Sequence, residues 1–112
     1  MEHTDMAKKF LQEAIGGTDY FHTAESYFLL GVISEKEGNR EDALNNYINV
    51  IYLYPEAEEF VIKARLKAAE IMKEEGQKKE AACMLKPLKD KTLTEKLAEK
   101  LSQILKGLPE CR

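Results

Sequence analysis

The sequence predicts an all-α protein: an antiparallel helix-hairpin array of about six helices. Hydrophobic residues recur at spacings of three and four along most of the chain, which is the period of an amphipathic helix. The chain has no Trp and only 3 Pro among 112 residues, which fits helices better than a β-sandwich or a disordered chain. A set of small and apolar residues also repeats at an interval of 38 residues, and such a period is typical of stacked helical units.

The composition fits one domain over residues 1–112, with 33% charged and 44% hydrophobic residues. The net charge of −3 hides an uneven distribution. Residues 1–62 hold 4 basic and 12 acidic side chains, whereas residues 63–106 hold 12 basic and 7 acidic ones. This division could favour head-to-tail association, or it could reflect solvated helix faces. The basic half lacks the interleaved aromatic residues that nucleic-acid binding uses, so no nucleic-acid partner is expected.

The two cysteines, Cys83 and Cys111, lie far apart in the sequence. One falls in an apolar helical stretch and the other in the tail, so two free thiols are expected rather than a disulfide. A reducing, cytoplasmic compartment follows, or the periplasm if the chain is excised from a secreted precursor. No apolar run approaches the roughly 20 residues of a membrane span, so no direct membrane insertion is expected.

The first element is a short helix over residues 4–15. Thr4 or Asp5 can cap its start, and Gly16-Gly17 ends it. Its apolar positions are Ala7, Phe10, Leu11, Ala14 and Ile15.

The second helix begins after Thr18 or Asp19 and runs to about Glu37. Gly31 lies in its middle, where Gly costs about 1 kcal/mol relative to Ala. That position therefore predicts a second helix packed too close for a methyl group. Gly38 follows at the helix end, where a positive φ favours Gly.

The third helix is capped by Asn39, with Asp42 completing a weak capping box. Tyr54-Pro55 ends it, since proline disfavours helical geometry in the preceding residue. Its packed face is formed by Ala43, Leu44, Tyr47, Val50 and Ile51.

The fourth and fifth helices repeat this pattern 38 residues later. Ala69, Gly76, Ala81, Leu85 and Leu88 correspond to Gly31, Gly38, Ala43, Tyr47 and Val50. Pro87 closes the fifth helix. A capping box, Thr92 to Glu95, opens a last helix with an apolar stripe and a charged face, which is typical of a cap. The expected parts are 1–23 as a half-repeat and linker, 24–57 and 58–90 as two repeats, and 91–108 as the capping helix.

These residues resemble a tetratricopeptide (TPR) repeat. The pattern within 24–57 is Tyr27, Leu30-Gly31, Gly38, Ala43, Tyr47, Val50 and Pro55, with Ser34 departing from the family's aromatic position. The second unit is more degenerate, because Arg65 occupies the large apolar position. The extra four residues around 56–61, after Tyr54-Pro55, more weakly resemble the longer repeats of bacterial envelope TPR proteins of the Tol–Pal-associated and outer-membrane assembly types. The resemblance implies structural roles for Tyr27, Leu30, Gly31, Gly38, Ala43, Tyr47, Pro55, Ala69, Gly76 and Ala81.

The resemblance also implies a concave, partner-binding groove lined by the first helix of each repeat. Its expected residues are Glu25, Phe28, Leu29, Val32, Glu35 and Lys36, then Lys63, Leu66, Lys67, Glu70, Lys73 and Glu74. Phe28, Leu29 and Val32 would form an apolar strip, each worth roughly 1.5–3 kcal/mol when buried on a partner. Alternatively, the N-terminal helix or a second copy of the chain covers this strip. Phe28 and Val32 occupy the positions where carboxylate-clamping members carry Lys and Asn, so that clamp is not expected.

Two functions remain open at this point. The first is an adaptor or assembly factor that presents its groove to a peptide or amphipathic helix of another protein. The second is a self-associating scaffold, a homo-oligomer that uses the same apolar strip. No enzymatic role, cofactor or metal is expected, because His3 and His22 have no ligand or triad partner at a suitable spacing.

Overall fold

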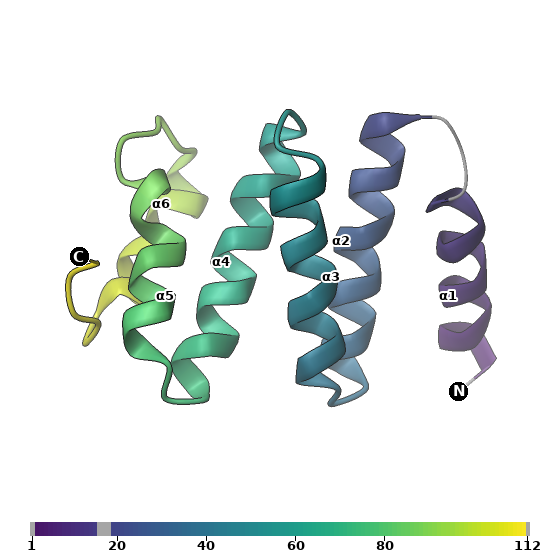
Figure 1. Cartoon of the computed structure of the whole chain (residues 1–112), viewed down its shortest axis with the longest axis horizontal. Coiled ribbons are helices and arrows are strands. Elements are labelled where there is room, and N and C mark those ends of the chain that lie inside the picture. The colour runs from purple at the N-terminus through teal and green to yellow at the C-terminus, as the bar shows by residue number, and fades with distance from the viewer. Residues whose placement is uncertain (1, 16–18, 112) are drawn as a thin grey trace. The chain divides into compact units, whose positions relative to one another are not determined.

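The computed structural model describes residues 2–15 and 19–111, with the side chains of 5–13, 15 and 19–111. The predicted all-α class is confirmed, since these ranges contain six α-helices, one short 3-10 helix and no strand (Figure 1). The helices are α1 Glu2–Ile15, α2 Tyr20–Lys36, α3 Arg40–Leu53, α4 Glu58–Glu74, α5 Lys78–Leu85, η1 Lys86–Leu88 and α6 Glu95–Leu105.

The chain divides into two compact units, Met1–Ala64 and Arg65–Arg112. We call them unit 1 and unit 2. The division falls inside α4, whereas the sequence places a repeat boundary before residue 58. Each unit is built around helices that are neighbours in the chain.

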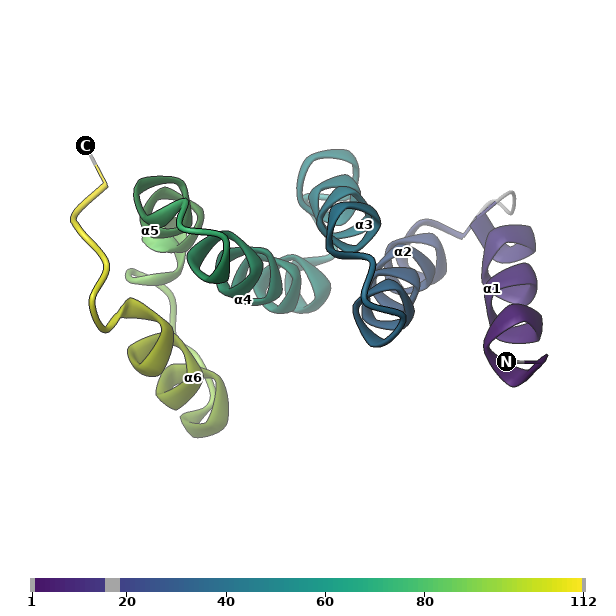
Figure 2. The ribbon, with the colours of Figure 1, turned by 90° about the horizontal axis from the view of Figure 1, so that it is seen from below.

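Unit 1 is built on α2 and α3, which lie antiparallel and side by side, with α1 against α2 (Figures 1 and 2). Gly31 is buried at the contact between α2 and α3. A Cβ atom there would lie 2.5 Å from Cε1 and 2.8 Å from Cδ1 of Tyr47, whose side chain is fully buried. The predicted close contact therefore exists, and the group that demands a glycine is the Tyr47 ring.

The two helix-to-helix turns use the same hydrogen bonds, 38 residues apart. Gly38 has a φ of +79° and Gly76 a φ of +83°, which is the left-handed region that favours glycine. Gly38 N–H donates to the Glu35 carbonyl at 3.0 Å, and Gly76 N–H donates to the Lys73 carbonyl at 3.1 Å. The repeated glycine thus ends a helix in each unit, as predicted.

The N-terminal caps of α2 and α3 are also as predicted. Asp19 Oδ1 accepts the His22 backbone N–H at 3.0 Å, and Asn39 Oδ1 accepts that of Asp42 at 3.1 Å. Asp42 reciprocates, because its carboxylate accepts a bond from the Asn39 side-chain amide at 2.7 Å.

Two other predicted helix starts are wrong. α1 begins at Glu2, so Thr4 and Asp5 lie inside it rather than at its cap. α6 is capped by Thr94, whose hydroxyl accepts the Leu97 N–H at 3.3 Å, and not by Thr92. Threonines that lie two residues apart are equivalent in a local pattern, and the chain's path decides between them. The predicted breaker Gly16-Gly17 and the alternative cap Thr18 lie outside the described residues.

Aromatic side chains gather where α2 begins and α3 ends. The ring of Tyr54 lies 5.0 Å from that of Tyr20 and 5.9 Å from that of Tyr27. Burial raises the pKa of the Tyr54 hydroxyl, and the two neighbouring tyrosines add to the effect. The Tyr20 hydroxyl accepts the Glu56 N–H at 3.1 Å, which ties the turn after Pro55 to the start of α2.

Unit 2 contains a disulfide between Cys83 and Cys111, with Cα atoms 4.7 Å apart. The prediction of two free thiols is therefore wrong. The chain leaves α5 through η1, runs along α6, and then returns beside α5, where the tail meets Cys83 (Figure 2). Sequence separation gave no sign of this return.

Arg65, the departure from the repeat pattern, also has a structural role in unit 2. Its guanidinium donates to the Met84 carbonyl at 3.1 Å, where the chain nears the end of α5. The buried aliphatic residues of unit 2 include Ala68, Ala69, Ala81, Leu85 and Leu88.

Candidate functional site

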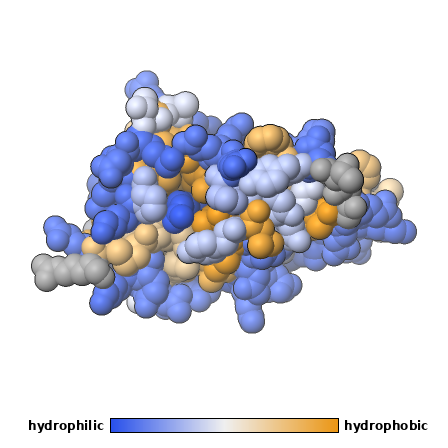
Figure 3. Space-filling model, turned by 45° about the horizontal axis from the view of Figure 1, so that its top comes forward, coloured by the Kyte–Doolittle hydropathy of each residue, from blue (hydrophilic) through white to orange (hydrophobic). Residues whose placement is uncertain are grey.

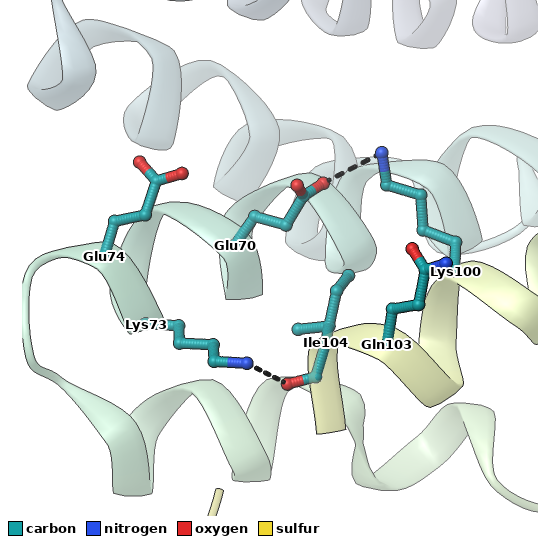
Figure 4. Close-up of a pocket in the computed structure, with 6 residues that line it drawn as sticks. All are labelled: Glu70, Lys73, Glu74, Lys100, Gln103 and Ile104. Carbon is teal, nitrogen blue, oxygen red and sulfur yellow. Dashed lines mark hydrogen bonds and ion pairs between the residues drawn. The ribbon is translucent and has the colours of Figure 1, made fainter. Parts of the chain in front are cut away.

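The site begins with a pocket of about 460 Å³ between α4 and α6 in unit 2 (Figure 4). Six side chains line it. They are Glu70, Lys73 and Glu74 from α4 and Lys100, Gln103 and Ile104 from α6. We call this the α4–α6 groove.

The amphipathic pattern of α6 positions its side of the groove. Leu101 and Ile104 are buried, which orients the helix toward the core of unit 2. Lys100 and Gln103 precede them in sequence and therefore border the apolar stripe, at the rim of the groove. The groove thus has an apolar floor at Ile104 and polar walls.

Lys73 fastens the end of α6 to α4. Its ammonium group donates to the Ile104 carbonyl at 3.0 Å and to the Lys106 carbonyl at 2.7 Å. The last carbonyls of a helix have no partner within the helix and carry partial negative charge, so a cation stabilises them. Lys73 therefore holds one wall of the groove in place.

Glu70 and Lys100 face each other across the groove. Lys100 Nζ lies 3.2 Å from Glu70 Oε1, so the two form an ion pair (Figure 4). That oxygen is buried, and it accepts no hydrogen bond from the described residues. The contact between Glu70 and Lys100 is therefore an ion pair without hydrogen-bond geometry, and 35% of the Glu70 side chain and 44% of the Lys100 side chain are exposed.

The predicted groove residues of the second repeat are in different environments. Glu70, Lys73 and Glu74 line the groove, and Lys67 is partly exposed. Leu66 is only 3% exposed and belongs to the core, so it does not present a surface to a partner. Lys63 lies in unit 1, where its ammonium group lies 3.0 Å from Glu59 and 5.8 Å from the centre of the Phe60 ring.

The predicted apolar strip of unit 1 is partly covered by its own unit. The ring of Phe28 lies 5.6 Å from that of Tyr47 and 6.1 Å from that of Phe60, and Phe28 is half-buried. Val32 is also half-buried, and Leu29 is 39% exposed. Patches of hydrophobic surface accordingly interrupt a mainly hydrophilic one (Figure 3).

The polar residues predicted beside that strip also differ in exposure. Lys36 is exposed at the end of α2, and Glu25 is half-buried. Glu35 is engaged within the unit, because its carboxylate accepts the hydrogen bond of the Tyr47 hydroxyl.

Sequence reasoning missed Lys100, Gln103 and Ile104, because it treated the last helix only as a solvating cap. One signal could have revealed them. The stripe of Leu97, Leu101 and Ile104 must face the preceding helices, so residues bordering it stand at the edge of that contact.

Comparison with protein-family models, curated proteins and solved structures found no match to this chain. The TPR resemblance therefore stays a prediction. Within residues 2–15 and 19–111, no helix has both the length and the apolar character needed to cross a membrane. The same residues contain no group of three or more His, Cys, Asp or Glu side chains arranged to hold a metal ion.

Proposed function

We propose that this chain is a protein-interaction module of the TPR kind, whose α4–α6 groove receives a peptide or helical segment of another protein. The observation that carries the proposal is the groove itself. A pocket of about 460 Å³ joins side chains from the first helix of the second repeat to side chains of the last helix. Pockets and grooves between helices are frequent binding sites for ligands and helical segments.

The groove chemistry favours a segment with a particular composition. The Glu70 side chain is 35% exposed and presents a carboxylate in the groove, and Ile104 adds an apolar lining residue. A segment that carries a Lys or Arg next to an aliphatic side chain would satisfy both groups. Charge-assisted hydrogen bonds of this type are roughly twice as strong as neutral ones. The proposal involves binding alone, with no cofactor and no chemical step.

Self-association through the Phe28 strip receives less support. The half-buried Phe28 ring already lies beside Tyr47 and Phe60 within unit 1. A partner would therefore gain less apolar burial there than an open strip offers.

The disulfide bears on the compartment. Disulfides persist in oxidising environments and are rare in the cytosol. The Cys83–Cys111 bond therefore supports the periplasmic alternative over the cytoplasmic expectation.

A photoreactive amino acid at Gln103 tests the groove directly. Gln103 is exposed and lines the pocket, so a bound segment is within reach of a cross-link. The matched control places the same group at Lys79, which is exposed on α5 and does not line the pocket. We expect a defined cross-linked partner from position 103 and none from position 79. Equal labelling from both positions contradicts the proposal.

Binding of the captured segment can then be measured with purified chain. We expect Glu70→Gln to weaken it by about tenfold or more, because the substitution removes the negative charge that a Lys or Arg of the segment would pair with. Glu99→Gln makes the same charge change on α6 outside the pocket, and we expect little effect from it. Equal losses in the two variants would show a nonspecific charge effect instead of recognition in the groove.

A further inference from the structure

A second candidate surface lies on α1 in unit 1. Met6 is 71% exposed and Phe10 is 72% exposed, more than any other large hydrophobic residue of the described side chains. The two stand four residues apart and therefore share one helix face. A shallow pocket of about 360 Å³ on this face is lined by Met6, Lys9, Phe10 and Glu13. We call these four residues the α1 face.

The α1 face corrects an expectation from the sequence. The apolar positions of this helix include Phe10 and Ala7, yet both are exposed, and Leu11 and Ile15 are half-buried. α1 packs against α2, and Lys8 forms an ion pair at 2.5 Å with Glu37, where α2 ends. Phe10 therefore lies on a face that its own unit leaves uncovered.

The charges of the α1 face identify what could cover it. Lys9 and Glu13 are four residues apart, one of each sign, beside the two apolar side chains. Two copies of such a face match when the helices run antiparallel, because each Lys9 then meets the Glu13 of the other copy. A parallel pair would instead set lysine against lysine and glutamate against glutamate.

We propose that α1 is a self-docking helix, on which the α1 face of a second copy packs antiparallel. A two-fold axis near Phe10 and Leu11 brings the two Phe10 rings together and forms two Lys9–Glu13 pairs. This contact is isologous, because the same patch serves both copies. It buries apolar side chains at the centre and leaves charged pairs at the rim, as protein interfaces generally do.

The charge distribution of the chain also suggests a different surface of a second copy that could cover the α1 face. Unit 1 carries 5 basic and 12 acidic side chains, and unit 2 carries 12 basic and 8 acidic ones. A basic unit 2 from another copy could thus approach the acidic unit 1 head to tail. The four residues of the α1 face are balanced in charge, however, and they match themselves better than a basic surface.

Sedimentation equilibrium tests the proposal, at chain concentrations up to about 1 mM because one short helix pair makes a small interface. We expect a dimer that Phe10→Ser weakens by about tenfold or more. Lys9→Glu should weaken it similarly, and the double exchange Lys9→Glu with Glu13→Lys should restore it. The matched control is Phe21→Ser on α2, which removes an aromatic ring that is 56% exposed, and which should leave the dimer unchanged.

Circular dichroism on each variant separates loss of association from loss of folding. A monomer at every concentration overturns the proposal, as does a dimer that keeps its affinity in Phe10→Ser with its helical content unchanged. A double exchange that fails to restore the dimer also overturns it. One combination of results identifies head-to-tail packing of opposite charges instead. In that case the Phe10→Ser variant still associates, and added salt abolishes association of the original chain.

Discussion

The two units carry different side chains at corresponding positions of the 38-residue repeat. In unit 1, Gly31 leaves room for the buried Tyr47 ring. In unit 2, the residues 38 positions later are Ala69 and Leu85, and both are fully buried. The large ring thus goes with a glycine, and the smaller leucine goes with an alanine. Because protein interiors are close-packed, we expect the sizes of the two residues to be matched within each unit.

The units also differ in how their ends are held. Unit 1 relies on aromatic contacts and on the hydrogen bond from the Tyr47 hydroxyl to Glu35. Unit 2 replaces these with polar and covalent links, namely the Arg65 bond to the Met84 carbonyl and the disulfide from Cys83 to Cys111. Three predictions test this difference, from the largest expected effect to the smallest.

Loss of the disulfide should lower the stability of unit 2 selectively. The two cysteines are 28 residues apart, and loop-closure entropy for that length predicts a loss of roughly 3.5 kcal/mol. Hydrogen exchange on the Cys83→Ser, Cys111→Ser double variant measures it. Amides of α5 and α6 should lose protection while those of α2 and α3 keep theirs. Equal loss across both units would show that they unfold together.

The pairing of Gly31 with Tyr47 should appear as a coupling energy. Gly31→Ala places a Cβ atom within 2.9 Å of three Tyr47 ring atoms and should destabilise the chain by about 1–3 kcal/mol. Combining it with Tyr47→Leu gives the residue types that unit 2 has at the corresponding positions, Ala69 and Leu85. The double variant should then lose less than the sum of the single losses, by about 1 kcal/mol.

Urea unfolding of the four proteins measures this cycle. Ala69→Gly in unit 2 is the matched control, and it should cost about 1 kcal/mol of helix propensity plus about 0.8 kcal/mol for the lost buried methyl group. Additive losses at positions 31 and 47 would mean that the ring moves aside at no cost.

The smallest effect concerns the cap of α2. The His22 backbone N–H lowers the pKa of the Asp19 carboxyl below its ordinary value of 3.8, and the charge of His22 lowers it further. Because the folded pKa is depressed, the stabilisation is present above the unfolded pKa and is lost as the pH falls through the folded pKa. An NMR titration of the Asp19 carboxyl should give a midpoint below 3.8. His22→Gln should raise that midpoint while leaving it below 3.8, and a normal value in the original chain would contradict the cap.

Local patterns were enough to place most helix ends. Gly38 and Gly76 stand where helices end, because the backbone there has a positive φ that glycine adopts most easily. Pro55 follows α3 because proline cannot continue a helix. Asp19 and Asn39 cap helices through bonds to residues three positions later. Each of these effects acts within one turn of the chain, so the printed sequence contains all the information needed.

Local patterns did not predict the contacts between residues that are distant in the sequence. The expected groove residues Glu70, Lys73 and Glu74 do line a pocket, but its second wall comes from α6 and includes Lys100. Leu66 recurs at the same helical spacing as the other expected groove residues, yet its side chain is buried. The side of a helix that meets another helix depends on where the chain turns back, and a single helical period leaves that choice open.

By itself, the sequence determined the all-α class, the 38-residue repeat, the starts of α2 and α3 and the ends of α2, α3 and α4, because those depend on backbone dihedral preferences and hydrogen bonds over three or four residues. The tertiary structure alone decided that Cys83 meets Cys111, that Phe10 lies uncovered and that α6 forms a wall of the groove. Such outcomes depend on loop paths that bring remote segments together, and the spacing of residues within a helix does not predict those paths.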